Sequence, residues 1–306
     1  MSDNAQAAIL IDHPAFGHHL AFDIRHADGI ADPAALVRKT LGQLAAIADG
    51  EKIAVGIGLS LVELLGHEIE GLKSHPQITA HGVDTPSTPR ALWCWLRADD
   101  QGELLFLARK IRSLLAPAFE CSESQNLFLY TAQERDLSGF VDGTENPKDA
   151  VAIEAAIASQ MGPGLDGGSY LVVQKWQHDF AALDAIAAEG TTAINAVMGR
   201  DRTSDEELKD KPAASHVART DQESFGRPAK IIRRNMPWAN DDLEGGTLFM
   251  GFGRSFDAFE LQWHRMLGLE DGITDALFRF TRPLTGAYYW CPPMADGKLD
   301  LRALGM

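Results

Sequence analysis

The chain has 306 residues, enough for two domains or a duplicated one, and its 45% hydrophobic and 23% charged residues are typical of a globular protein. A formal net charge of −15 argues against a nucleic acid or an anionic membrane surface as partner, because either needs a basic face. There is no run of the ~20 apolar residues that a membrane span needs, and the N-terminus has neither a basic start nor a long apolar stretch, so a cytoplasmic protein is expected. Cys94, Cys121 and Cys291 form no C-x-x-C pair, which favours buried, inert thiols over disulfides or a thiolate metal site.

The first half of the chain alternates predicted strands and helices. Pro33 suits the first turn of a helix, and the apolar residues that follow it recur at helical spacing. A second helix is strongly amphipathic, with basic residues toward its C-terminal end, where they suit the helix dipole. The expected elements are strands at 18–25, 52–60, 91–99 and 119–124 and helices at 32–49 and 101–117.

The second half repeats this rhythm of strand, helix, strand, strand, helix and strand. The expected strands are 167–179, 230–238, 246–255 and 286–292, and the expected helical segments are 180–201, 256–269 and 273–281. This order predicts an α+β fold of two ferredoxin-like subdomains, residues 1–148 and 149–306, although no sequence repeat accompanies it. The glycines of "GLDGGS", residues 164–169, indicate a turn and not a phosphate-binding loop, since no strand precedes them and no lysine follows.

The segment "GFVDGTENP", residues 139–147, combines turn-forming residues with apolar ones. Four of its nine residues are Gly, Pro or Asn, which predicts a tight loop, but Phe140 and Val141 favour burial. Asp142 lies between them and a glycine. It either caps a turn or is an acid held at a functional site.

His216 lies among small apolar residues in "KPAASHVART". Small neighbours would allow a flat, bulky ligand to approach the imidazole, and the alternative is a histidine at a helix start or in a turn. Asp275 follows in a predicted apolar helix. It is either a charge that favours the helix N-terminus or a buried partner to a histidine, for which it would fix the tautomer.

Arg233 and Arg234 lie in the strand-like segment "IIRRNMPW". Because side chains alternate along a strand, one arginine should face inward and the other outward, with Arg233 and Asn235 on one face. An inward guanidinium is costly unless it meets an anion or acceptors. The alternative is a surface ion pair on an edge strand.

Together these segments resemble the dye-decolorizing peroxidases. "GFVDGTENP" is similar to the G-x-x-D-G signature of that family, and "HVAR" at His216 and "RRN" at 233–235 follow in the order that the family uses. The likeness extends over nearly the whole chain and is greatest to the compact, cytoplasmic B-type subgroup. It implies a dimeric α+β barrel-type heme peroxidase fold, in agreement with the predicted elements.

The resemblance also implies one heme b per chain and a set of site residues. His216 is the implied axial iron ligand, with Asp275 as its hydrogen-bond acceptor. Asp142, Arg233 and Asn235 are the implied catalytic residues over the peroxide site. The other implied cofactor contacts are Phe249, packed on the distal face, and the loop residues Gly143, Thr144 and Glu145.

The chemistry of peroxide explains these residue types. Hydrogen peroxide must lose a proton from one oxygen and gain one on the other before the O–O bond breaks, which Asp142 can mediate if ionised. Arg233 is always cationic, so it can stabilise developing negative charge, keep Asp142 ionised and contact a heme propionate. A carboxylate-supported His216 would favour a ferryl intermediate.

The function implied is a heme b peroxidase that uses hydrogen peroxide to oxidise bulky dyes, phenolic compounds and other aromatic donors. The alternative is a heme- or porphyrin-binding protein that handles heme or removes its iron. A bulky dye cannot enter a pocket sized for peroxide, so electrons would arrive from surface sites, for which Trp and Tyr residues are available, although packing in the core or an interface is the favoured explanation for each of them. Self-association into a dimer or larger homo-oligomer is expected, and the ending "DGKLDLRALGM" argues against a docking tail for a protein nanocompartment (encapsulin).

Overall fold

The computed structural model of the protein describes residues 4–26, 32–131 and 133–306. Its centre is a 10-stranded sheet with the main order β6-β1-β5-β2-β12-β7-β10-β8, in which β11 pairs with β7 and β9 with β10. Numbered along the chain, the four main strands of each half take the order 4-1-3-2, and β12 meets β2 through Trp290 and Ile57. The prediction of an α+β fold with two ferredoxin-like halves is confirmed.

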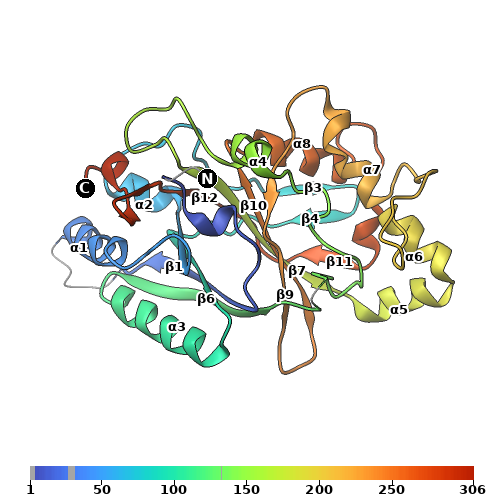
Figure 1. Ribbon diagram of the computed structural model, residues 1–306, viewed down its shortest axis with the longest axis horizontal. Coiled ribbons are helices and arrows are strands. Elements are labelled where there is room, and N and C mark those ends of the chain that lie inside the picture. The colour runs from blue at the N-terminus through green and yellow to red at the C-terminus, as the bar shows by residue number, and fades with distance from the viewer. Residues whose placement is uncertain (1–3, 27–31, 132) are drawn as a thin grey trace.

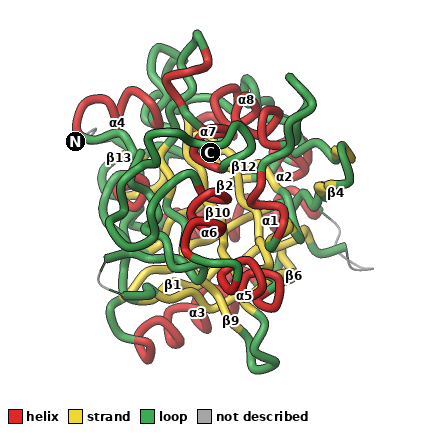
Figure 2. The backbone as a smooth tube through the Cα atoms, turned by 90° about the vertical axis from the view of Figure 1, so that its right-hand side faces the viewer, coloured by secondary structure: helices red, strands yellow, loops and turns green. Residues whose placement is uncertain are grey.

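The two halves contribute helices to opposite ends of this sheet. In Figure 1, α1 and α3 lie near β1 and β6, whereas α5, α6, α7 and α8 lie at the other end. Figure 2, seen from the side of α5 and α6, shows α8 and α3 at opposite edges of the strands. The first-half elements are β1 (Phe16–Ile24), α1 (Pro33–Ala45), β2 (Ile53–Ile57), α2 (Leu59–Leu64), β3 (Ile78–Ala80), β4 (Val83–Thr85), β5 (Leu92–Ala98), α3 (Gln101–Leu115) and β6 (Phe119–Phe128), after a short 3-10 turn η1 (Ala7–Ile9).

The second half carries more short elements than the first. Its strands are β7 (Ser169–His178), β8 (Ile232–Arg233), β9 (Met236–Ala239), β10 (Gly245–Gly253), β11 (Thr281–Pro283), β12 (Ala287–Cys291), β13 (Met294–Ala295) and β14 (Lys298–Leu299). Its helices are α4 (Asp149–Ala156), α5 (Phe180–Ala188), α6 (Thr191–Met198), α7 (His216–Thr220) and α8 (Asp257–Met266), with the 3-10 turns η2 (Gln222–Phe225), η3 (Ala276–Arg279) and η4 (Arg302–Leu304).

Local sequence signals set the long helices. Asp32 caps α1 by accepting a hydrogen bond from the Ala35 amide at 2.9 Å, and Pro33 occupies its first turn. Asp100 caps α3 in the same way, accepting from the Glu103 amide at 2.8 Å. These ends could therefore be predicted from the sequence.

Alternation along the strands divides the core between the two faces of the sheet. In β5, Leu92, Cys94 and Leu96 pack on the side of α1 and α3, and Trp93 and Trp95 pack on the other side. All three cysteines are unpaired, and burial raises the pKa of Cys94, as expected of an inert thiol. Cys121 is only partly buried, so the prediction of three buried thiols is wrong at that position.

Three predicted elements are interrupted. The strand predicted at 230–238 breaks between β8 and β9, where the Asn235 side chain accepts a hydrogen bond from the Met250 amide at 3.0 Å. The helix predicted at 180–201 divides into α5 and α6 at Gly190, whose φ of +116° suits glycine. The helix predicted at 273–281 is only the turn η3, and Asp275 is its N-cap, not an interior residue.

Some short elements have no counterpart in the prediction. The helices α2 and α4 and the β3–β4 hairpin lie in stretches without clear periodicity. The short helix α7 begins at His216, as the helix-start alternative for that residue expected. No helix in residues 4–26, 32–131 and 133–306 has both the length and the apolar character needed to cross a bilayer.

Candidate functional site

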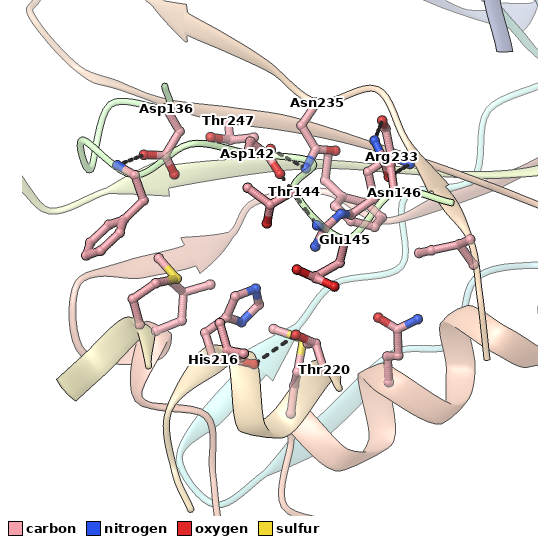
Figure 3. A pocket seen from close by; sticks show the side chains of 18 of the residues that line it. Asp136, Asp142, Thr144, Glu145, Asn146, His216, Thr220, Arg233, Asn235 and Thr247 are labelled. Carbon is pink, nitrogen blue, oxygen red and sulfur yellow. Dashed lines mark hydrogen bonds and ion pairs between the residues drawn. The ribbon is translucent and has the colours of Figure 1, made fainter. Parts of the chain in front are cut away.

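A cavity of about 410 Å³ lies between the 136–147 loop, the strands β7, β8 and β10 and the helices α7 and α8. Figure 3 shows the loop acids on one wall and His216 on the facing one. The volume lies in the usual range for a small-molecule site. The apolar part of its lining includes Phe140, Trp176, Phe249, Trp263, Met266, Leu277 and Phe280.

His216 is the first residue of α7 and lines the cavity. Its Nδ1 lies 2.8 Å from Asp275 Oδ2, and the buried Asp275 also accepts from the Leu277 amide at 2.8 Å. Because a carboxylate only accepts hydrogen bonds, the imidazole proton is on Nδ1 and the lone pair on Nε2. Nε2 is then the nitrogen free to bind a metal, and both interpretations left open for Asp275, helix cap and histidine partner, hold together.

A backbone contact brings the two segments of this pair together. The Ala276 amide donates to the Ala214 carbonyl at 2.7 Å, which places Asp275 beside His216 although 59 residues separate them.

Asp142 lies on the opposite wall with its side chain 24% exposed. Its Oδ2 accepts a hydrogen bond from Asn235 Nδ2 at 2.7 Å, and its Oδ1 accepts from the Gly143 amide at 2.6 Å. Gly143 has a φ of +70°, a conformation that glycine adopts without strain. Asn235 therefore ties the acid to the sheet, since its other amide atom bonds β10.

Arg233 lies beside Asp142, with 3.9 Å between Nη2 and Oδ1. Its side chain is only 14% exposed, so the alternative of a surface ion pair is wrong. Its Nε is buried and has no hydrogen-bond partner among the described residues, which leaves donor capacity at the cavity wall. Arg234 is also buried and donates to the Ile9 carbonyl at 3.0 Å, so the expectation that one of the two arginines faces outward is wrong.

Asn146 fixes the loop against this arginine, a role that the sequence analysis missed. Its Oδ1 accepts from the Arg233 amide at 2.9 Å, and its Nδ2 donates to the Arg233 carbonyl at 2.9 Å. The Asn146 side chain thus makes the two hydrogen bonds to the Arg233 backbone that a neighbouring strand would make to β8. The only sequence signal is its place in "GTENP".

Some of the remaining predicted site residues line the cavity, and others lie behind the lining. Phe249, Thr144 and Glu145 line the cavity, whereas Gly143 and Asp275 stand behind lining residues. Glu145 pairs at 3.1 Å with Arg200, a buried arginine of the lining that the sequence analysis did not single out.

Two further titratable residues of the lining were also missed. Burial raises the pKa of Asp136 to about 6, although its Oδ1 accepts hydrogen bonds from the Ser138 and Phe140 amides. Burial lowers the pKa of His178, at the end of β7, to about 4. Asp136 lies in a segment without a recognisable pattern, and His178 ends a predicted strand in which nothing marked it as a functional residue.

Comparisons with known proteins identify the family of this chain. The model of the family "Dyp-type peroxidase, C-terminal" matches residues 133–296, which include both walls of the cavity. A dye-decolorizing peroxidase of Brevibacterium linens is 32% identical over 272 residues, 87% of this chain and 72% of its own length. One of Mycolicibacterium paratuberculosis is 35% identical over 227 residues, 71% of this chain and 62% of its own length, so this chain spans less than two thirds of that relative.

Solved structures extend the likeness to nearly the full chain. A variant of Rhodococcus jostii RHA1 DypB, solved in complex with heme, has a TM-score of 0.83 and 28% identity over 93% of this chain and 95% of its own. A dye-decolorizing protein from V. cholerae has a TM-score of 0.80 and 27% identity, covering 97% of this chain and 98% of its own. The chain belongs to the Dyp-type peroxidases, a family of peroxidase enzymes.

Proposed function

We propose that the protein is a heme b peroxidase, with one heme per chain, that uses hydrogen peroxide to oxidise aromatic donors. The observation that carries the proposal is the opposition of two groups across one cavity. The His216–Asp275 pair lies on one wall, and Asp142, Asn235 and Arg233 lie on the other. The heme complex of the Rhodococcus relative supports the choice of cofactor.

The residues present fit a heme. His216 offers Nε2 as the iron ligand, and the apolar rings of the lining suit a porphyrin face. The unpartnered Nε of Arg233 suits a carboxylate of such a ligand, and Arg200, which lines the same cavity, is paired with Glu145 and Glu207. Phe249 lies on β10 next to Phe259, with ring centroids 5.7 Å apart, so its ring is held in place at the wall.

The heme, when bound, supplies the two-electron redox chemistry toward peroxide. Asp142 takes a proton from one peroxide oxygen and returns it to the other, which leaves as water. Arg233 stabilises the negative charge that develops on the leaving oxygen. Asn235 holds the carboxylate in place, and Asp275 holds the His216 proton on Nδ1, which makes Nε2 a stronger donor to iron.

The division into residues 1–148 and 149–306 is part of this proposal. Most of the lining comes from the second half, and the first half contributes the loop that carries Asp142. The two parts would then form one heme-binding unit. A cytoplasmic location, self-association and the oxidation of bulky dyes at the protein surface stay predictions from the family resemblance.

An absorption spectrum of the heme-loaded protein, before and after one equivalent of peroxide, tests the proposal. We expect a ferric heme band that changes on peroxide addition and returns on addition of a phenolic or azo donor. Release of metal-free porphyrin without donor oxidation would instead support the heme-handling alternative. Absence of a bound-heme spectrum would contradict both functions.

A further inference from the structure

A second, much smaller cavity lies next to the Asp142 carboxylate. Its volume is about 10 Å³, close to the space that one water molecule requires. Four residues line both cavities, Asp136, Asp142, Asn235 and Thr247, so the two share a wall. Figure 3 shows these four on the upper wall of the large cavity.

His13 lines the far side of the small cavity. Its Nδ1 lies 3.3 Å from Glu134 Oε1, and its side chain is 7% exposed. With Nδ1 directed at a carboxylate, Nε2 accepts from the small cavity when the ring is neutral and donates into it when the ring carries a proton on both nitrogens. That nitrogen is buried and has no hydrogen-bond partner among the described residues, so the small cavity offers it an unfilled polar contact.

Glu134 connects this histidine with solvent. The Glu134 side chain is 39% exposed, so its carboxylate is in contact with solvent. The hydrogen bond from His13 lowers the pKa of Glu134, which favours the ionised carboxylate beside His13. The Glu134 carbonyl also accepts from the Asp142 amide at 3.1 Å, which joins the two ends of the path through one loop.

Asp136 supplies a second acid on the shared wall. The hydrogen bonds to its carboxylate, from Ser138 and Phe140, all reach Oδ1, so Oδ2 has no such bond within the described part of the chain. Burial and the nearby charge of Asp142 raise the Asp136 pKa to about 6, so part of the population carries a proton near neutral pH.

We propose that the small cavity holds one water molecule that carries protons between Asp142 and solvent, through the His13–Glu134 pair and with Asp136 as a second donor. This inference rests on the proposed function. One turnover consumes one hydrogen peroxide, two electrons and two protons and forms two water molecules. The step at Asp142 returns the proton that it takes, so both consumed protons must come from elsewhere.

The path supplies those two protons when electrons arrive at the protein surface. An aromatic donor oxidised there releases its own proton to solvent, far from the cavity, so the buried site needs a separate route. The charged groups that line the small cavity with His13 are Glu134, Arg135, Asp136 and Asp142, and Arg234 interacts electrostatically with Glu134 and Asp12.

A crystal structure of the heme-loaded protein tests the water directly. We expect one ordered water within ~2.6–3.2 Å of His13 Nε2 and of an Asp136 or Asp142 oxygen. An empty cavity overturns the proposal, whatever the activity of the protein.

Stopped-flow measurements on His13→Gln test the transfer. The reaction with peroxide should keep its rate, because it needs no net proton, whereas the subsequent reduction by a donor should slow about tenfold or more. The solvent isotope effect of the reduction should rise in the variant, a change that a merely structural role of His13 does not produce. Equal slowing of both steps, or no slowing, overturns the proposal.

A second variant of the path and a control variant complete the test. Glu134→Gln should slow the reduction in the same direction and tests the path even if His13→Gln fails to fold. His18→Gln, on β1 and bonded to Ser124, should change neither step. A wild-type protein that binds heme but does not react with peroxide refutes the proposed function, and the water in the small cavity is then judged by the crystal structure alone.

Discussion

The loop over the cavity is predicted to depend on Asn146 more than on its acidic residues. Replacing Asn146 by alanine removes two hydrogen bonds of 2.9 Å to the Arg233 backbone. At ~1 kcal/mol each, their loss weakens the seating of the loop by ~2 kcal/mol. An equilibrium between seated and open loop then shifts about 30-fold toward the open form.

Hydrogen exchange and peroxide kinetics measure this effect together. The Arg233 amide of Asn146→Ala should exchange about 30-fold faster if the open form governs exchange. The reaction with peroxide should slow as well, because Asp142 is then less often beside Arg233. Asn240→Ala is the matched control, since its side chain caps the exposed β9–β10 hairpin away from the cavity. Unchanged exchange at Arg233, or an equal effect in the control, would refute the reasoning.

The other predictions concern the two walls of the cavity. His216→Ala should abolish or strongly shift the ferric Soret band, and an unchanged spectrum excludes His216 as the ligand. Asp275→Asn should keep a hydrogen bond but lose the charge, so spectroelectrochemistry should find a more positive heme potential; an unchanged potential contradicts this role. Arg233→Leu should slow the reaction with peroxide more than Asp142→Ala, because the charge stabiliser acts directly; stopped-flow rates in the reverse order disprove this ranking. The pKa of Asp136 is raised to about 6, so between about pH 4 and pH 6 the folded state binds a proton that the unfolded chain has lost, and the contribution of Asp136 to stability falls as pH rises through this range. Asp136→Asn should therefore raise the Tm at pH 7.5 more than at pH 4. Equal Tm shifts at both pH values would contradict this prediction.

The sequence by itself determined the order of the main strands and long helices, and it marked the residues with recognisable patterns. The caps of α1 and α3 depend on residues three positions apart, Asp32 with Ala35 and Asp100 with Glu103, so a linear pattern contains them. The motif loop with Asp142, the histidine among alanines and the paired arginines also stand out locally. That is why each of these residues could be assigned to a common site before the fold was known.

Only the tertiary structure decided how these residues are held. Asn146 forms a hydrogen bond with Arg233, 87 positions away, and no sequence periodicity relates the two residues. Asp136 becomes a perturbed acid because other segments bury it, and His13 is connected to the site only where its segment meets the 134–142 loop. Hydrogen bonds and desolvation act through space, so partners that are distant along the chain leave no local pattern to predict them.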